Sequence, residues 1–223
     1  MNRPLKLIVA VAGFGLAACT GSLFQSKAAP PTIYLLSAAA GAPAAGGPAA
    51  GAPAAGSPAA EIPVDLAVLK PKLRTGLETD RIAVLYPDRR LDYFADARWS
   101  GPLAEVLQDV ALKEFHSRGH LHTVSGDASV FASGYWLEIE VTDFQAEYAS
   151  SASAPTVYVR FLARIGTADD RRILGQFEAR AQQPAAENRL SAIVDAYARA
   201  ADAAMVQLVA DVDETLGNAS KAR

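Results

Sequence analysis

The sequence predicts an α/β (α+β) fold, a two-layer sandwich in which a largely antiparallel sheet carries two main helices on one face. Three segments, residues 135–148, 157–165 and 172–180, alternate apolar and polar side chains and are joined by short polar connections. Two further segments, after residue 102 and over residues 188–216, repeat apolar side chains at helical spacing. Such a meander buries its apolar face against the helices, which predicts two layers.

The N-terminal segment predicts export and lipid attachment. Residues 1–18 have the features of a signal peptide, with Arg3 and Lys6 before an apolar stretch too short to span a bilayer. The following residues resemble a bacterial lipobox: Leu16, Ala17, Ala18 and Cys19. By that resemblance Cys19 is the lipid-attachment residue, and residues 19–31 form the lipidated N-terminus and tether. The alternative is a buried thiol, but Cys19 is the only cysteine, and a lone thiol is unusual in an exported protein.

Residues 32–37 form a predicted first strand, and residues 38–60 form a repeat of Ala, Gly and Pro interrupted only by Ser57. The repeat has no large side chain to bury, and its regularly spaced prolines prevent a continuous helix, so it is a disordered loop or a spacer. If residues 32–37 pair with the later sheet, the repeat is a loop inside the domain; otherwise the tether continues to about residue 61. A free apolar strand would be an aggregation hazard, which favours pairing.

The globular domain is predicted over residues 61–217. Residues 64–69, 81–86 and 121–124 have strand composition. Ser100 is the expected N-cap of the first helix, and the helix is expected to end at Gly119. Its apolar stripe contains Leu103, Val106, Leu107, Val110 and Phe115.

The sequence pattern also predicts a bulge and an ion pair in the meander, and the residue at which the last helix ends. The alternation changes phase near Thr142, which predicts a β-bulge. A hairpin centred on Asp169 places Arg160 directly opposite Glu178. The last helix ends at Gly217, before a polar tail over residues 218–223.

Composition and motifs exclude several functions. With a net charge of -3, the chain lacks the excess of cations that nucleic-acid binding requires. The three histidines (His116, His120 and His122) are expected to be solvated or capping groups, and Glu138 and Glu140 to lie on a solvated strand face. No phosphate-binding loop or nucleophile elbow occurs. We therefore expect no catalytic residue, metal or cofactor, and no enzyme. Trp99 and Tyr93 are either core residues or partner contacts.

Several segments together resemble the ABC-type transport auxiliary lipoprotein family, the PqiC-like lipoproteins. The resemblance rests on the lipobox, the early strand, the strand at Arg81, and the run Arg98, Trp99, Ser100, Gly101, Pro102 and Leu103. The repeat at residues 38–60 departs from the family, in which this loop is short.

The resemblance implies a non-enzymatic periplasmic partner of an MCE (MlaD-like) lipid transporter that forms a homo-oligomer. Because Thr20 rather than Asp follows Cys19, it also implies an outer-membrane anchor facing the periplasm. A lipoprotein that activates or scaffolds a cell-wall synthesis complex is the alternative, for which the Ala- and Pro-rich spacer would be suitable.

Overall fold

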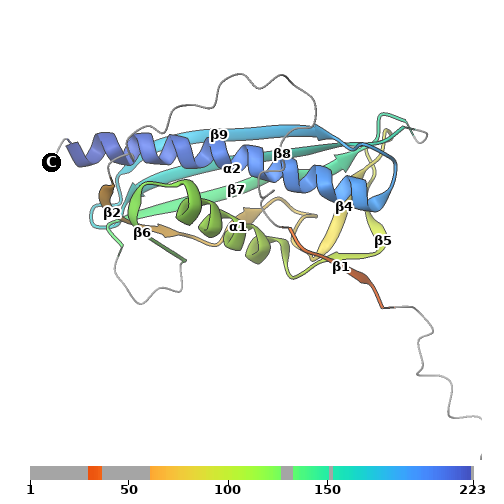
Figure 1. Cartoon of the computed structure of the whole chain (residues 1–223), viewed down its shortest axis with the longest axis horizontal. Helices are drawn as coiled ribbons and strands as arrows, with labels where there is room; N and C mark the ends of the chain where they lie inside the picture. The colour runs from red at the N-terminus through yellow and green to blue at the C-terminus, as the bar shows by residue number, and fades with distance from the viewer. Residues whose placement is uncertain (1–29, 37–60, 127–132, 151–152, 222–223) are drawn as a thin grey trace, which may run out of the picture. The chain divides into compact units, whose positions relative to one another are not determined.

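The computed structural model describes residues 30–36, 61–126, 133–150 and 153–221, and these form a two-layer α+β sandwich as predicted (Figure 1). The two helices are α1 (Leu103–Arg118) and α2 (Leu190–Lys221). The nine strands of the described sheet are β1 (Thr32–Tyr34), β2 (Ile62–Val68), β3 (Lys72–Leu73), β4 (Arg81–Leu85), β5 (Leu91–Trp99), β6 (Leu121–Gly126), β7 (Tyr135–Glu147), β8 (Thr156–Thr167) and β9 (Ile173–Pro184).

The antiparallel meander of β7, β8 and β9 forms one half of the sheet. The predicted bulge is confirmed, because the β7–β8 register shifts between Val141 and Asp143. The predicted pairing of β8 with β9 is wrong by two residues: Arg160 lies opposite Arg180, and Glu178 lies opposite Leu162. A second irregularity, between Ile165 and Gly166, inserts an extra residue on β9 and displaces the register.

The other edge of β7 pairs in parallel with three short strands in succession, which the sequence did not indicate. β2 pairs at the start of β7, β3 near its middle and β4 at its end. β6 lies outside β2, and β5 lies outside β4, with β1 beyond it. β5 was not predicted because its inward and outward positions do not alternate regularly and Asp96 has a φ of 52°.

Strand β1 pairs with β5 in parallel, with Thr32 beside Ala97 and Tyr34 beside Trp99. The predicted strand extended to residue 37, whereas the paired segment is Thr32–Tyr34. β1 and β2 therefore belong to one sheet, and residues 35–61 connect them. The signal peptide, Cys19 and the Ala, Gly and Pro repeat lie outside the described residues.

Both helices lie on the same face of the sheet and contact each other (Figure 1). The core between the layers is built from the inward side chains of the strands and the apolar faces of the helices. α1 begins after Pro102 without a side-chain cap, so the N-cap prediction for Ser100 is wrong. The Leu103 N–H instead donates to the Thr79 carbonyl, at 3.1 Å. The predicted end of α1 at Gly119 is confirmed.

The last helix is longer than predicted, because it continues through Gly217 to Lys221. Leu216 is buried, and Gly217 lies beside Ile62 of β2. Contact with the sheet thus extends to the last turns of the helix, and tertiary packing overrides the low helix propensity of glycine. Neither described helix combines the length and the apolar composition that a membrane-spanning helix needs.

Candidate functional site

The face of β7, β8 and β9 that points away from the helices is the most strongly charged surface of the meander. Alternation along each strand directs apolar side chains into the core and charged ones outward. We call this surface the polar face, and its charged and polar side chains include Glu138, Glu140, Asp143, Tyr158, Arg160, Arg164, Glu178, Arg180 and Gln182.

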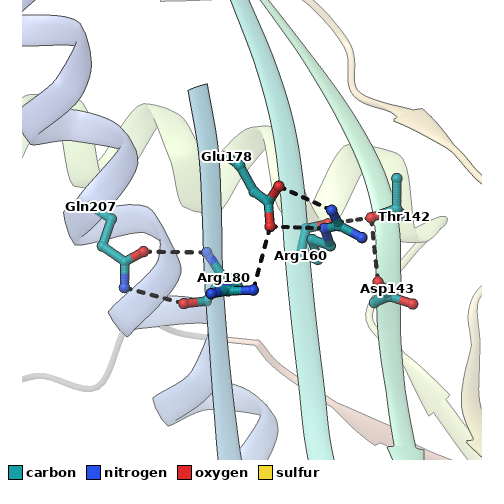
Figure 2. A network of polar contacts seen from close by, with 6 residues as sticks. All are labelled: Thr142, Asp143, Arg160, Glu178, Arg180 and Gln207. Atoms are coloured by element: carbon teal, nitrogen blue, oxygen red, sulfur yellow. Dashed lines mark hydrogen bonds and ion pairs between the residues drawn. The ribbon is translucent and has the colours of Figure 1, made fainter. Parts of the chain in front are cut away.

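A polar network crosses the three strands of the polar face: the Thr142 hydroxyl of β7 donates to the Arg160 carbonyl of β8, and ion pairs join Arg160 to β9 (Figure 2). The Arg160 guanidinium donates two hydrogen bonds to the Glu178 carboxylate, at 3.1 and 2.9 Å. Arg180 approaches the same carboxylate at 3.9 Å. The hydrogen bond from Arg160 lowers the pKa of Glu178, and the same contact raises the pKa of Arg160. The predicted ion pair therefore forms, but diagonally across the sheet rather than between directly opposed residues.

A second charged cluster lies beside the first and joins β7 to β3. Glu138 accepts a hydrogen bond from Lys72 at 2.5 Å and another from Arg164. The hydrogen bond from Lys72 lowers the pKa of Glu138. A carboxyl group whose pKa is lowered is unsuited to donate a proton at neutral pH, so Glu138 is poorly suited to act as a general acid.

The polar face contains an open hollow of about 590 Å³ over the second halves of β7 and β9 and the first half of β8. Its side-chain lining includes Asp143, Tyr158, Arg160, Arg180 and Gln182. Arginine guanidinium groups and a tyrosine ring are the side chains that protein partners most often engage at hot spots. The hollow therefore offers both charge and an aromatic surface to a binding partner.

One contact in this region could not be predicted from the sequence. Gln207 of α2 accepts a hydrogen bond from the Arg180 backbone N–H and donates one to the Arg180 carbonyl, both at 3.2 Å (Figure 2). Among the described strands β9 pairs with β8 alone, and this amide occupies backbone groups of the other edge of β9. A single glutamine on a helix predicts no such contact, because the contact depends on how α2 lies along β9.

The three histidines do not converge. His116 Nδ1 lies 2.6 Å from the Leu112 carbonyl oxygen within α1, His120 Nδ1 lies 2.8 Å from Asp213 of α2, and His122 Nδ1 lies 2.6 Å from Glu61. The hydrogen bond to Glu61 raises the pKa of His122. Within the described part of the chain, no three His, Cys, Asp or Glu side chains are grouped so that they could hold a metal ion.

Comparison with known proteins identifies the family of this chain. A family model described as "ABC-type transport auxiliary lipoprotein component" matches residues 48–209. The chain belongs to this family. None of the curated proteins matches it.

Two solved structures resemble the auxiliary lipoprotein in fold. One is the crystal structure of protein XCC0632 from Xanthomonas campestris, of family DUF330, which is 21% identical with a TM-score of 0.67 and covers 86% of this chain and 97% of its own. The other is the crystal structure of an uncharacterized protein, 14% identical with a TM-score of 0.54, covering 69% of this chain and 94% of its own. Both structures share the fold of this auxiliary lipoprotein.

The two aromatic residues singled out in the sequence occupy different environments in the auxiliary lipoprotein. Trp99 is 1% exposed, and its ring packs edge-on against Tyr197 and Phe144, with centroids 5.3 and 6.0 Å away. Of the two alternatives for Trp99, the structure supports burial in the core. Tyr93 is half-buried: its hydroxyl donates to the Gly76 carbonyl at 2.8 Å, and Arg81 lies 4.3 Å from its ring centroid. Cys19 lies outside the described residues.

Proposed function

We propose that this lipoprotein is a non-enzymatic, periplasmic auxiliary component of an MCE-type (MlaD-like) ABC lipid transport system that connects the inner and outer membranes. The observation that supports this proposal most strongly is the family match over residues 48–209, which includes most of the globular domain. The charged, helix-free polar face supports it further, because an auxiliary component acts by binding its partner.

The proposal includes an outer-membrane anchor at Cys19. Thr20 follows the cysteine, where lipoproteins of the inner membrane carry Asp, and a multiply acylated N-terminus holds a protein stably to a bilayer. Replacing Cys19 with Ser should release the protein into the soluble periplasmic fraction. A Cys19→Ser protein that still sediments with membranes would contradict the anchor.

The transporter subunit docks on the polar face in this proposal. A specific complex buries about 800 Å² on each partner, and the three long strands of the meander offer an extended surface. Several copies arranged around one symmetric MCE subunit would multiply individually weak contacts, which is why we propose a homo-oligomer. Tyr93, half-buried beside Arg81, is a proposed additional contact.

Co-purification tests the proposed function. The lipoprotein is expressed together with the MCE subunit, permease and ATPase of an MCE transport system from the same organism, and the preparation is purified through the lipoprotein in mild detergent. We expect the MCE subunit to be recovered, and mass determination of the complex to give more than one copy of the lipoprotein. Recovery of the lipoprotein alone, at native expression levels, would overturn the proposal.

A further inference from the structure

Two exposed aliphatic side chains lie close together at the start of the described domain. Ile33 is 56% exposed and Leu35 is 74% exposed, whereas Tyr34 between them packs against the core. Alternation along an extended chain places Ile33 and Leu35 on the same side. Among the described residues, the other large apolar side chains that are exposed, Ile173 and Val206, lie on different elements.

The backbone at this position is also open. β1 pairs with β5 on one side, and no strand of the described residues pairs with its other side. An exposed strand edge that also carries branched aliphatic side chains is a hazard for aggregation, so we expect another surface to cover it in the cell. We call Ile33, Leu35 and the open side of β1 the β1 edge.

The chain itself places this edge near a membrane. Twelve residues, 20–31, separate Cys19 from Thr32. Twelve residues reach at most about 40 Å even when the chain is fully extended. An acylated Cys19 therefore keeps the β1 edge close to the bilayer, where contact between them is effectively intramolecular.

The neighbouring side chains suit a lipid surface. Ile33 lies beside Arg98 of β5, and Arg98 lies beside Arg81 of β4, so the three residues form one row across the sheet. Arg98 is ion-paired with Asp80 at 2.9 Å, whereas Arg81 is stacked on the Tyr93 ring. Aliphatic side chains next to arginine are a combination that inserts at a membrane interface and contacts phosphate headgroups.

We infer that the β1 edge lies on the bilayer that carries the lipid anchor, with Ile33 and Leu35 inserted among the headgroups. This inference rests on the acylation of Cys19 in the proposed function. It makes β1 a second, protein-borne membrane contact, which orients the domain instead of leaving it free at the end of its tether.

A fluorescent label tests the inference in the acylated full-length protein. Acylation consumes the Cys19 thiol, so Leu35→Cys introduces a single free thiol, which is labelled with an environment-sensitive dye. The matched control is Ile173→Cys on β9, also an exposed apolar position, at 48%. Each protein is reconstituted into vesicles of phosphatidylethanolamine and phosphatidylglycerol with and without a quencher attached to the lipid. We expect several-fold stronger quenching at position 35 than at position 173.

Equal quenching at the two positions, or no quenching at position 35, would overturn the inference. A label at position 35 that is shielded from water in lipid-free detergent and cross-links to a second copy would assign the β1 edge to an interface between copies instead. Flotation of the vesicles and the intact mass of the protein report acylation separately. A protein that lacks acyl chains and does not float contradicts the anchor of the proposed function, whereas a floating protein without quenching contradicts only the β1 contact.

Discussion

Trp99 joins the two layers of the domain. It is the last residue of β5, and its buried ring contacts Tyr197 of α2 and Phe144 of β7. We predict that Trp99→Ala lowers the free energy of unfolding by about 3–5 kcal/mol, because the surrounding side chains cannot fill the cavity. Urea denaturation of the periplasmic domain measures this change. A loss below about 1 kcal/mol would show that the ring is not part of the core.

Tyr197 contributes a buried polar contact to the same cluster. Its hydroxyl donates to the Ala83 carbonyl at 2.5 Å, and burial raises the pKa of this hydroxyl. Tyr197→Phe should cost about 1–2 kcal/mol, because the carbonyl then has one partner fewer in a dry environment. Tyr93→Phe is the matched control, since its hydroxyl also donates to a carbonyl but is only part-buried. Equal losses from the two substitutions would contradict this argument.

His122 and Glu61 provide a pH-dependent contact. Glu61 raises the folded-state pKa of His122, so the contact stabilises the fold fully below the ordinary histidine value of about 6.5 and loses its effect as pH rises through the raised value. Glu61→Gln should therefore reduce thermal stability more at mildly acidic pH than at alkaline pH. Both side chains are exposed, so high salt should diminish the difference. A difference that is independent of pH would contradict the assigned contact.

The contacts of single residues were predictable where a local sequence pattern determined the direction of the side chain. The Arg160–Glu178 pair follows from the outward phase of β8 and β9, and forms although the exact register was wrong. The Ser100 cap was wrong because the acceptor for the first helical N–H comes from Thr79, far away in the chain. Gln207 could not have been found, because its role depends on the position of α2 beside β9.

At the scale of elements, the end of α2 is a place where tertiary contact outweighs local helix propensity. Gly217 lies inside the helix, and a Cβ added there would lie 3.7 Å from Ile62, an ordinary contact distance. Gly217→Ala should therefore stabilise the domain by about 0.5–1 kcal/mol. Thermal unfolding measures the change. If Gly217 instead ended the helix in a left-handed conformation, alanine would destabilise it.

Gly76 is the matched control, with the opposite expected sign. Its φ is 92°, and a Cβ would lie 2.7 Å from Leu91. Gly76→Ala should destabilise the domain, because alanine is strained in this backbone conformation and its methyl group displaces Leu91. The two substitutions together test whether the distinction between these glycines is correct.

The elements of the meander were predictable because alternation within each strand reports a solvated and a buried face. The three short strands β2, β3 and β4 are different. Their parallel pairing with β7 joins segments far apart in sequence, and no local pattern specifies such a partner or its register. β5 was missed for a related reason, since its irregular burial pattern includes Asp96 in the left-handed region.

At the scale of the whole molecule, placing both helices on one face leaves the other face of the meander open to solvent. The sequence predicted this two-layer arrangement, and several segments together, among them the lipobox and the run from Arg98 to Leu103, predicted the family. It indicated the Arg160–Glu178 pair, but it could not predict that Arg180 joins this pair beside a hollow lined from β7, β8 and β9, because that depends on how the three strands pair. Strand pairing within the sheet thus brings the residues of the candidate site together, and no local sequence motif contains them.

The central claim is that the transporter subunit docks on the polar face. The most direct test is the co-purification of the MCE subunit with the double variant Arg160→Glu and Arg180→Glu, compared with the control pair Lys113→Glu on α1 and Arg189→Glu directly before α2. Reversing two charges within an interface should reduce recovery of the subunit about tenfold or more, while the control pair retains it. Unchanged recovery with the polar-face variant, or equal losses in both variants when each is folded, would contradict the claim.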